Sequence, residues 1–262
     1  MRAALCFFGI TRNLHPGTLA AMQKHLFAPI AALDPQFVRF GHFNLPGLIH
    51  NPRSKEHVAL AAGDFHLLGC DHLATTPQDT VDAGLNLPAF QAHGDAWEDG
   101  SVSLKNLLRQ CYSLEQVTRL LQAAGERFDV VIYSRADVLY RRCLRIPPIQ
   151  PGIIYTPHFA KWGGLNDRFA LGDQETMIHY GLRGRAAKDY VEQTGRPLHG
   201  EQFLAWYIAR QNLRNEDLDV LFWRVRGDGS IAPLDGPWRH LYTLYGMLQR
   251  LAKRRAGIRE DR

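Results

Sequence analysis

The sequence predicts an α/β protein with a mixed, mainly parallel central sheet flanked by helices, and three observations indicate this class. A β-branched and aromatic run at 130–133 has the composition of a buried central strand. Leucines recur at spacings of 3, 4 and 7 over 101–124, which predicts a long amphipathic helix. The apolar run at 3–10 is followed by a polar turn and a helical segment, as in the first unit of a nucleotide-binding α/β fold.

The first hundred residues are expected to hold three strands, one helix and a long loop. Thr18 is a suitable N-cap for a helix from about 19 to 33. Further strands are predicted at 37–43 and 65–68. Proline, glycine and acidic residues are frequent over 71–100, which favours a long binding loop or active-site loop.

The second half of the chain returns to the sheet several times. Three prolines at 147–151 predict an irregular connection after the central strand. Short strands are predicted at 153–156 and 169–171, and a late strand at 219–225. Asp173 suits the N-cap of a helix that continues to about Tyr180, and a further helix is predicted over 199–210.

Two polar segments lie where these strands are expected to end or begin. Arg135 and Asp137 follow the central strand, and in open α/β sheets ligands bind beyond the C-terminal strand ends. Asp137 suits a hard divalent cation that bridges a pyrophosphate, and Arg135 suits phosphate or carboxylate oxygens. The second segment runs Trp-Gly-Gly-Leu-Asn-Asp-Arg-Phe-Ala-Leu-Gly over 162–172. Its polar centre is either an ordinary turn before a strand or a binding loop, and the flanking glycines favour the loop.

These two segments together resemble a family of GT-A-like nucleotide-sugar glycosyltransferases of surface-polysaccharide biosynthesis. The matching motifs are Arg-x-Asp at 135–137 and Gly-Gly-x-Asn-Asp-x-Phe-Ala-x-Gly at 163–172, and the resemblance covers roughly 2–25 and 104–210. It implies a GT-A-like, Rossmann-like catalytic domain over 1–238. It also implies transfer of a sugar from a nucleotide diphosphate sugar to a glycan or lipid-linked acceptor.

The resemblance also implies roles for individual residues. Arg12, Arg135 and Asp137 would bind the donor, with Asp137 as the ligand of Mn²⁺ or Mg²⁺. Asn166 and Arg168 would bind the acceptor. Asp167 and Glu201 are the catalytic candidates, because an inverting enzyme needs a carboxylate that activates the acceptor hydroxyl. In a retaining enzyme no such base is required, and Asp167 would only bind.

Three alternatives stay open at this point. Most GT-A enzymes carry Asp-x-Asp where this chain has Arg-x-Asp, so a cation replaces one metal ligand. A non-catalytic nucleotide-sugar or glycan-binding protein on the same scaffold is therefore the rival prediction. Glu201 is either an acid favoured by the helix dipole or one that faces the acceptor. Arg109 and Gln110 are expected on a solvated helix face, although the resemblance hints at a sugar or phosphate role.

Charge and cysteine content limit the partners and the compartment. The net charge is +5, and the seven basic and two acidic residues from Arg239 onward account for the whole excess, so a protein-wide nucleic-acid surface is not indicated. Residues 239–262 are predicted to form a basic amphipathic tail that docks on the core or contacts an anionic membrane surface. The four cysteines form no Cys-x-x-Cys pair, and no apolar run reaches the ~20 residues of a membrane span. We therefore expect a cytoplasmic protein that is peripheral at the inner membrane surface.

Overall fold

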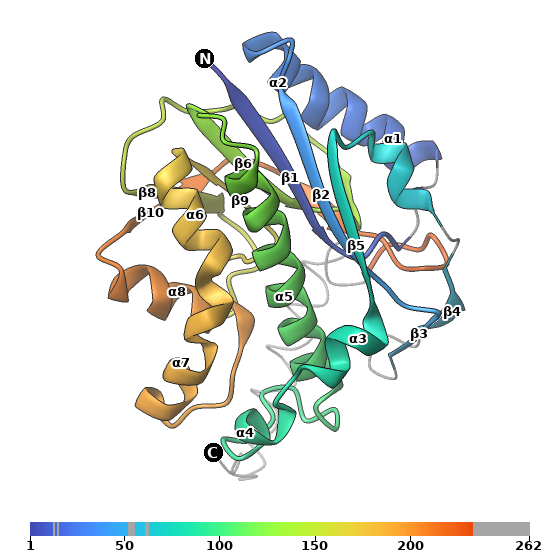
Figure 1. The fold of residues 1–262 in the computed structure, drawn as a ribbon, viewed down its shortest axis with the longest axis vertical. Helices are drawn as coiled ribbons and strands as arrows, with labels where there is room; N and C mark the ends of the chain where they lie inside the picture. Colours follow the sequence, from blue (N-terminus) through green and yellow to red (C-terminus); the bar gives the residue numbers. More distant parts are fainter. Residues whose placement is uncertain (13, 15, 52–55, 61–62, 233–262) are drawn as a thin grey trace, which may run out of the picture.

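A seven-stranded sheet forms the centre of the computed structural model of the protein (Figure 1). The structure describes residues 1–12, 14, 16–51, 56–60 and 63–232. Neighbouring strands run parallel except around β9, which is antiparallel to both of its neighbours. The prediction of a mixed, mainly parallel sheet is thus confirmed. In spatial order the strands are β10 (Arg214–Leu218), β8 (Ile153–Pro157), β9 (Phe169–Gly172), β6 (Val130–Arg135), β1 (Ala3–Gly9), β2 (Val38–Leu45) and β5 (His72–Pro77).

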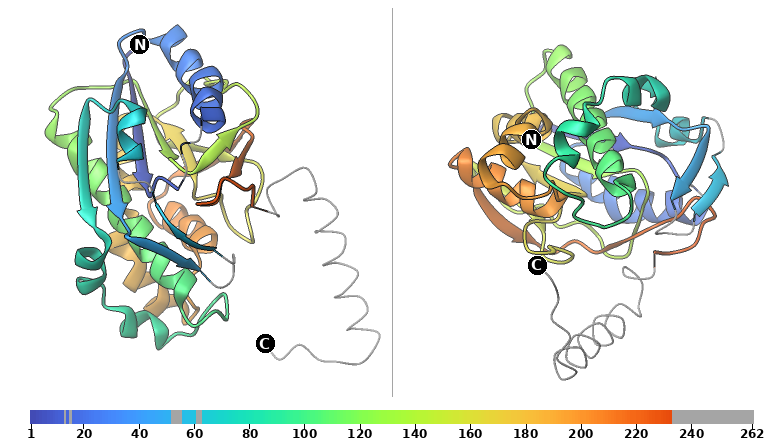
Figure 2. Two further views of the ribbon diagram at one scale, coloured as in Figure 1. Left: turned by 90° about the vertical axis from the view of Figure 1, so that its right-hand side faces the viewer. Right: turned by 90° about the horizontal axis from the view of Figure 1, so that it is seen from below.

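Helices cover both faces of this sheet (Figure 2). On one face, Leu5 and Phe7 of β1 belong to a core cluster with Met22, while on the other, Cys6 and Phe8 belong to a cluster with Leu114. Burial on both faces explains why the central strands are almost continuously apolar. The first face is covered by α1 (Pro16–Met22), the π-helical η1 (Gln23–Phe27) and α2 (Ala28–Leu33), and the second by α5 (Val102–Ala123), α6 (Gln174–Leu182) and α8 (Gly200–Arg210).

Two small sheets and several short helices complete the fold. Two antiparallel pairs are formed by β3 (Leu48–Asn51) with β4 (Glu56–Ala59) and by β7 (Val138–Tyr140) with β11 (Phe222–Arg224). The remaining helices of the described ranges are η3 (Asp64–Leu68), α3 (Gln78–Ala83), α4 (Leu87–Gln91), η4 (Arg183–Ala186) and α7 (Ala187–Thr194).

The strand predicted at 65–68 and the loop predicted at 71–100 are both wrong. Residues 64–68 form the 3₁₀ helix η3, bracketed by Gly63 and Gly69 in left-handed conformations. The next strand of the central sheet after β2 is β5, which starts at His72 and pairs with β2. The supposed loop contains β5, α3 and α4, and Phe90 packs against the core cluster of α5, α7 and α8.

Two boundaries differ from the sequence predictions, and a third agrees with them. The first helix starts at Pro16, before the expected cap Thr18. The late strand predicted at 219–225 is shorter, because β11 covers only 222–224, and the polar edge strand β10 at 214–218 was not predicted. The helix at 173–180 begins as predicted, since the carboxylate of Asp173 accepts a hydrogen bond from the amide of Thr176.

Several predictions are limited by what the structure describes. The basic tail at 239–262 lies outside the described residues. Within them, no helix is long and apolar enough to cross a membrane. All four cysteines are free thiols.

Candidate functional site

A cavity of about 750 Å³ opens at the C-terminal ends of β1, β2 and β6. Its position follows from topology, because parallel strands bring the turns after their C-terminal ends to the same edge of the sheet. Six arginines and three carboxylate residues line it, so the lining carries an excess of positive charge. These nine residues are Arg12, Arg109, Arg135, Arg168, Arg224, Arg226, Asp137, Asp167 and Glu201.

Arg135 and Asp137 form a paired unit at the end of the central strand. Nε and Nη2 of Arg135 donate to the two carboxylate oxygens of Asp137 at 2.8 and 2.5 Å. Asp137 is buried, which alone would raise its pKa, but the guanidinium groups of Arg135 and Arg12 hold that pKa below its ordinary value. Asp137 is therefore a carboxylate that balances two cations.

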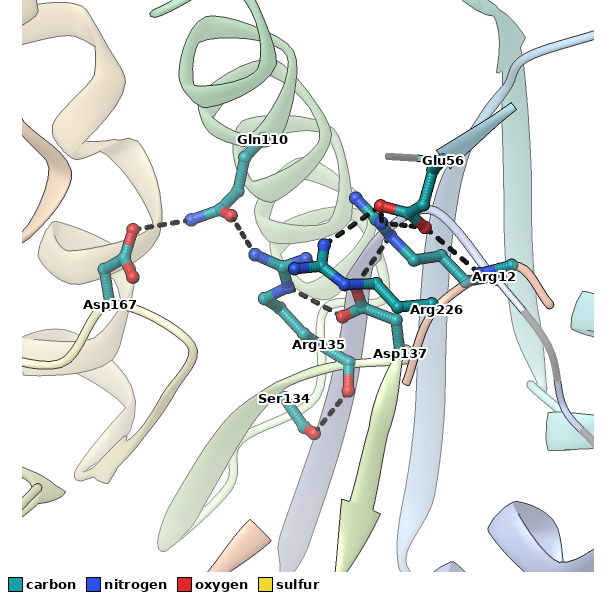
Figure 3. Close-up of polar contacts among 9 residues, drawn as sticks. Arg12, Glu56, Gln110, Ser134, Arg135, Asp137, Asp167 and Arg226 are labelled. Carbon is teal, nitrogen blue, oxygen red and sulfur yellow. Dashed lines mark hydrogen bonds and ion pairs between the residues drawn. The ribbon is translucent and has the colours of Figure 1, made fainter. Parts of the chain in front are cut away.

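Glu56 binds two further arginines beside this pair (Figure 3). Its carboxylate accepts from Nη1 of Arg12 at 2.5 and 2.6 Å and from Nη1 of Arg226 at 2.9 Å. Nε of Arg12 also lies 3.1 Å from Asp137. Three arginines from distant parts of the chain are thus gathered around two buried carboxylates.

Gln110 links this arginine cluster to the opposite side of the cavity. Its amide oxygen accepts from Nη1 of Arg135, and its amide nitrogen donates to Asp167, both at 2.9 Å (Figure 3). Gln110 is buried, and Arg109 is bound through Nε and Nη2 to Asp82 of α3 at 2.6 and 2.5 Å. The prediction that both side chains face solvent is therefore wrong, because the N-terminal half of α5 lines the cavity.

Asp167, Arg168 and Glu201 form a second buried charged group. They meet because β9 runs antiparallel to β6, so its start lies at the end of β6, where the amide of Arg135 donates to the carbonyl of Arg168 at 3.0 Å. Nη2 of Arg168 donates to Glu201 at 2.9 Å. Nδ1 of His199 lies 3.3 Å from the other oxygen of Glu201.

The two acids of this group have opposite pKa shifts. Burial would raise the pKa of Asp167, but Arg168, Arg183 and Arg135 hold it below its ordinary value. Burial, and then the negative charge of Asp167, raise the pKa of Glu201 to about 7, against the opposing effect of Arg168. Of the two, Glu201 is the group able to exchange a proton near neutral pH.

Two glycines allow the segment 164–167 to pack closely against the start of α8. A Cβ on Gly164 would lie 1.9 Å from the carbonyl oxygen of Glu201. The amide of Leu165 donates to that same oxygen at 2.9 Å. A Cβ on Gly200 would lie 2.8 Å from Asp167. The Gly-Gly segment therefore serves close packing of backbone against the start of α8.

The structure brings together most of the residues that the sequence singled out. Arg12, Arg135, Asp137, Asp167, Arg168 and Glu201 all line the cavity. Asn166 does not belong to that lining: its amide nitrogen donates to the carbonyl of Phe159, and its amide oxygen accepts from the backbone of Arg168. This geometry supports a turn-forming role for Asn166 and gives no support to acceptor binding.

The lining and adjoining residues that the sequence does not single out for the site include Glu56, Arg224, Arg226 and Trp162. The pairing of β7 with β11 sets Arg224 opposite Val138, directly after Asp137. The alternation of Arg224 and Arg226 in the otherwise apolar segment 220–226 is a usable signal. Glu56 offered none, because its partners lie 44 and 170 residues away.

The residues around Asp137 do not fit a divalent cation as they stand. Both of its oxygens accept from Arg135, and Arg12 lies beside it. Among the described residues, no group of three His, Cys, Asp or Glu side chains could hold a metal ion. A dication would need more oxygen ligands and would be repelled by the adjacent guanidinium groups.

Comparison with known proteins adds little beyond this geometry. No family model and no curated protein matches the chain. Among solved structures, the chain is similar to apo mouse xyloside xylosyltransferase 1, with 14% identity, coverage of 84% of this chain and 85% of that one, and a TM-score of 0.41. The fold and site define an α/β protein with an arginine-lined cavity at the C-terminal edge of its sheet.

Proposed function

We propose that the protein is a glycosyltransferase that moves a sugar from a nucleotide diphosphate sugar to a glycan or lipid-linked acceptor. The observation that carries this proposal is the division of one cavity into two halves. One half concentrates arginines, and the other holds Glu201 with its raised pKa. Such a pair of features suits a reaction that develops negative charge on a leaving group while a hydroxyl loses its proton.

The arginine half suits the diphosphate. Breaking the bond between the sugar C1 and the phosphate oxygen leaves negative charge on the pyrophosphate, which guanidinium groups stabilise by charge-assisted hydrogen bonds. Nε of Arg226 and Nε of Arg168 are buried without a hydrogen-bond partner among the described residues. Both arginines line the cavity, so a turn of either guanidinium would bring this unsatisfied donor to a bound anion.

The acidic half suits activation of the acceptor. A base works best when its pKa lies near the working pH, and among the two candidates Glu201 meets this condition. Asp167, whose pKa is held low, is the weaker base and raises the proton affinity of Glu201 through its charge. In this proposal Glu201 accepts the hydroxyl proton of the acceptor, and the negative charge of Asp167 raises the pKa of Glu201.

The cellular setting remains part of the proposal. A glycan acceptor of cell-surface polysaccharide synthesis, with the protein held at the inner membrane surface by the basic tail, would agree with the charge of residues 239–262. A non-catalytic nucleotide-sugar-binding protein would use the arginine half alone and would have no need of a titrating Glu201.

The first test is titration with UDP, GDP and CDP and with the corresponding nucleosides. We expect one diphosphate to bind, its nucleoside to bind more weakly, and Arg135→Gln to weaken the diphosphate by roughly tenfold or more. Arg142→Gln is the control, because Arg142 pairs with Asp219 on the surface. No binding of any diphosphate at millimolar concentration would overturn the proposal.

Turnover then separates the enzyme from the binding protein. The matching nucleotide sugars are incubated with the protein and a mixture of glycan acceptors, and release of nucleotide diphosphate is measured. Acceptor-dependent release that Glu201→Gln abolishes supports the transferase. Binding without release would leave the binding protein as the function.

A further inference from the structure

The loop before β9 places an exposed tryptophan at the cavity in an unfavourable backbone conformation. Trp162 lines the cavity and is 51% exposed. It follows Lys161 in a turn closed by a hydrogen bond from the amide of Gly164 to the carbonyl of Lys161 at 2.7 Å. The two central residues of this turn, Trp162 and Gly163, have φ angles of 44° and 81°.

Positive φ at both central positions normally selects asparagine, aspartate or glycine. A bulky aromatic residue there is disfavoured by contact of its Cβ with the backbone. Burial does not explain the choice, because about half of the residue's surface is exposed. Unfavourable conformations of this kind concentrate at ligand-binding sites, so the indole at this turn points to a ligand.

The surrounding contacts hold this turn in a fixed place relative to Glu201. Nζ of Lys161 pairs with Asp217 of β10 at 2.5 Å, on one side of Trp162. On the other side, the close approach of Gly164 and the hydrogen bond of Leu165 attach the loop to the carbonyl of Glu201. Trp162 therefore lies two residues before Gly164, which packs directly against the first turn of α8.

Two further aromatic rings line the cavity next to Glu201. The indole of Trp97 stacks on the imidazole of His199, with centroids 5.0 Å apart and an interplanar angle of 22°. His199 in turn lies beside Glu201. Trp97, His199 and Trp162 all line the cavity, so aromatic surface accompanies the charged group of Arg168 and Glu201.

We propose that Trp162 is a specificity-determining residue that stacks against a pyranose ring of the acceptor. A pyranose combines hydroxyl groups with a face of C–H bonds whose positive polarisation suits the negative face of an indole. Arg168 and Glu201 supply the polar partners that its hydroxyl groups require. The proposal rests on the proposed function and adds to it a sugar-ring acceptor and the residue that selects it.

Saturation-transfer NMR with methyl glycosides of glucose, galactose, mannose and N-acetylglucosamine tests this subsite. We expect at least one pyranoside to receive saturation, mainly at the protons of one ring face, while glycerol receives none. Trp162→Ala should weaken its binding by roughly three- to tenfold, and Trp162→Phe should retain most of it. Trp223→Phe is the control, because Trp223 lies under Arg141, outside the cavity lining.

Two results would overturn the inference while the proposed function stands. One is the absence of saturation transfer to every pyranoside when a nucleotide diphosphate still binds. The other is a glycoside signal that survives unchanged in Trp162→Ala; loss of nucleotide affinity in that variant would then assign the indole to the nucleobase. Failure of both nucleotide and glycoside binding would instead remove the proposed function. Thermal unfolding of each variant confirms that the fold is retained.

Discussion

Arg135 and Asp137 bind each other at the end of the central strand, and each is also bound to a third residue. Asp137 forms an ion pair with Arg12. Arg135 donates a hydrogen bond to Gln110, whose amide nitrogen donates to Asp167. A residue pair separated by one position in the sequence thus joins the two halves of the cavity. The stability and the ligand preference of the site both depend on this pair.

Removing the charge of Asp137 should destabilise the fold. In Asp137→Asn the partly buried guanidinium of Arg135 loses its counter-charge and that of Arg12 keeps only Glu56, so we expect the free energy of unfolding to fall by about 3 kcal/mol. Urea denaturation measures this loss. Asp219→Asn breaks the Arg142–Asp219 pair, which is half exposed, and should cost less than about 1 kcal/mol. Equal losses in the two variants would show that the Arg135–Asp137 pair contributes no more to stability than a surface ion pair.

Divalent cations should have little influence on nucleotide binding. Because the oxygens of Asp137 are already engaged by Arg135, we expect the affinity for a nucleotide diphosphate to be the same in Mn²⁺ and in EDTA, within about twofold. Calorimetric titration under both conditions measures this ratio. A large gain with Mn²⁺ that Asp137→Asn removes would show that the arginine pair opens to admit a metal.

Sequence reasoning succeeded where the burial of an element is symmetric and failed at edges. The strand around Val131 is covered on both faces, so its composition alone predicts it. The edge strands β5 and β10 carry many polar and partly exposed residues, so no apolar run or alternation marks them. Their place depends on backbone pairing with β2 and β8, which leaves little trace in side-chain pattern.

The residues of the site also divide into those that the sequence predicts and those that it does not. Arg135 and Asp137 are predictable because the end of a central parallel strand is a known location for ligands. Glu56 and Arg226 reach the site through contacts between distant segments, which no local pattern contains. The sequence places Gln110 in solvent because this residue lies off the apolar stripe of its helix. That stripe identifies only the side packed on the core, while the remaining face of α5 borders the cavity.

A methyl group at position 164 should disturb the loop that carries Trp162. The Cβ of Gly164→Ala would overlap the carbonyl of Glu201, and we expect the free energy of unfolding to fall by about 1–3 kcal/mol. Gly47→Ala is the matched control, because a Cβ there meets no atom within 4 Å and its φ is not positive. Chemical denaturation compares the two. A Gly164→Ala protein as stable as the wild type would contradict the close docking of this loop.

The raised pKa of Glu201 predicts a pH dependence of stability as well as of activity. The folded protein binds the carboxyl proton more tightly, with a pKa of about 7 against an ordinary value of 4.5. Stability from this group is therefore present below pH 4.5 and is lost as the pH rises to about 7. Urea unfolding across this range should show wild type losing stability relative to Glu201→Gln. Parallel curves would show that Glu201 does not titrate there.

The charges beside Glu201 should move the pH profile of the transferase in opposite directions. If Glu201 is the base, kcat/KM falls as the pH drops through its pKa, because the protonated carboxyl cannot accept a proton. Asp167 raises that pKa and Arg168 lowers it. Asp167→Asn should therefore shift the fall in kcat/KM to lower pH, and Arg168→Gln should shift it to higher pH. A purely structural role for both residues would lower activity without moving the midpoint. Glu201→Gln should be inactive across the whole range, and a midpoint retained in that variant would assign the titration to another group.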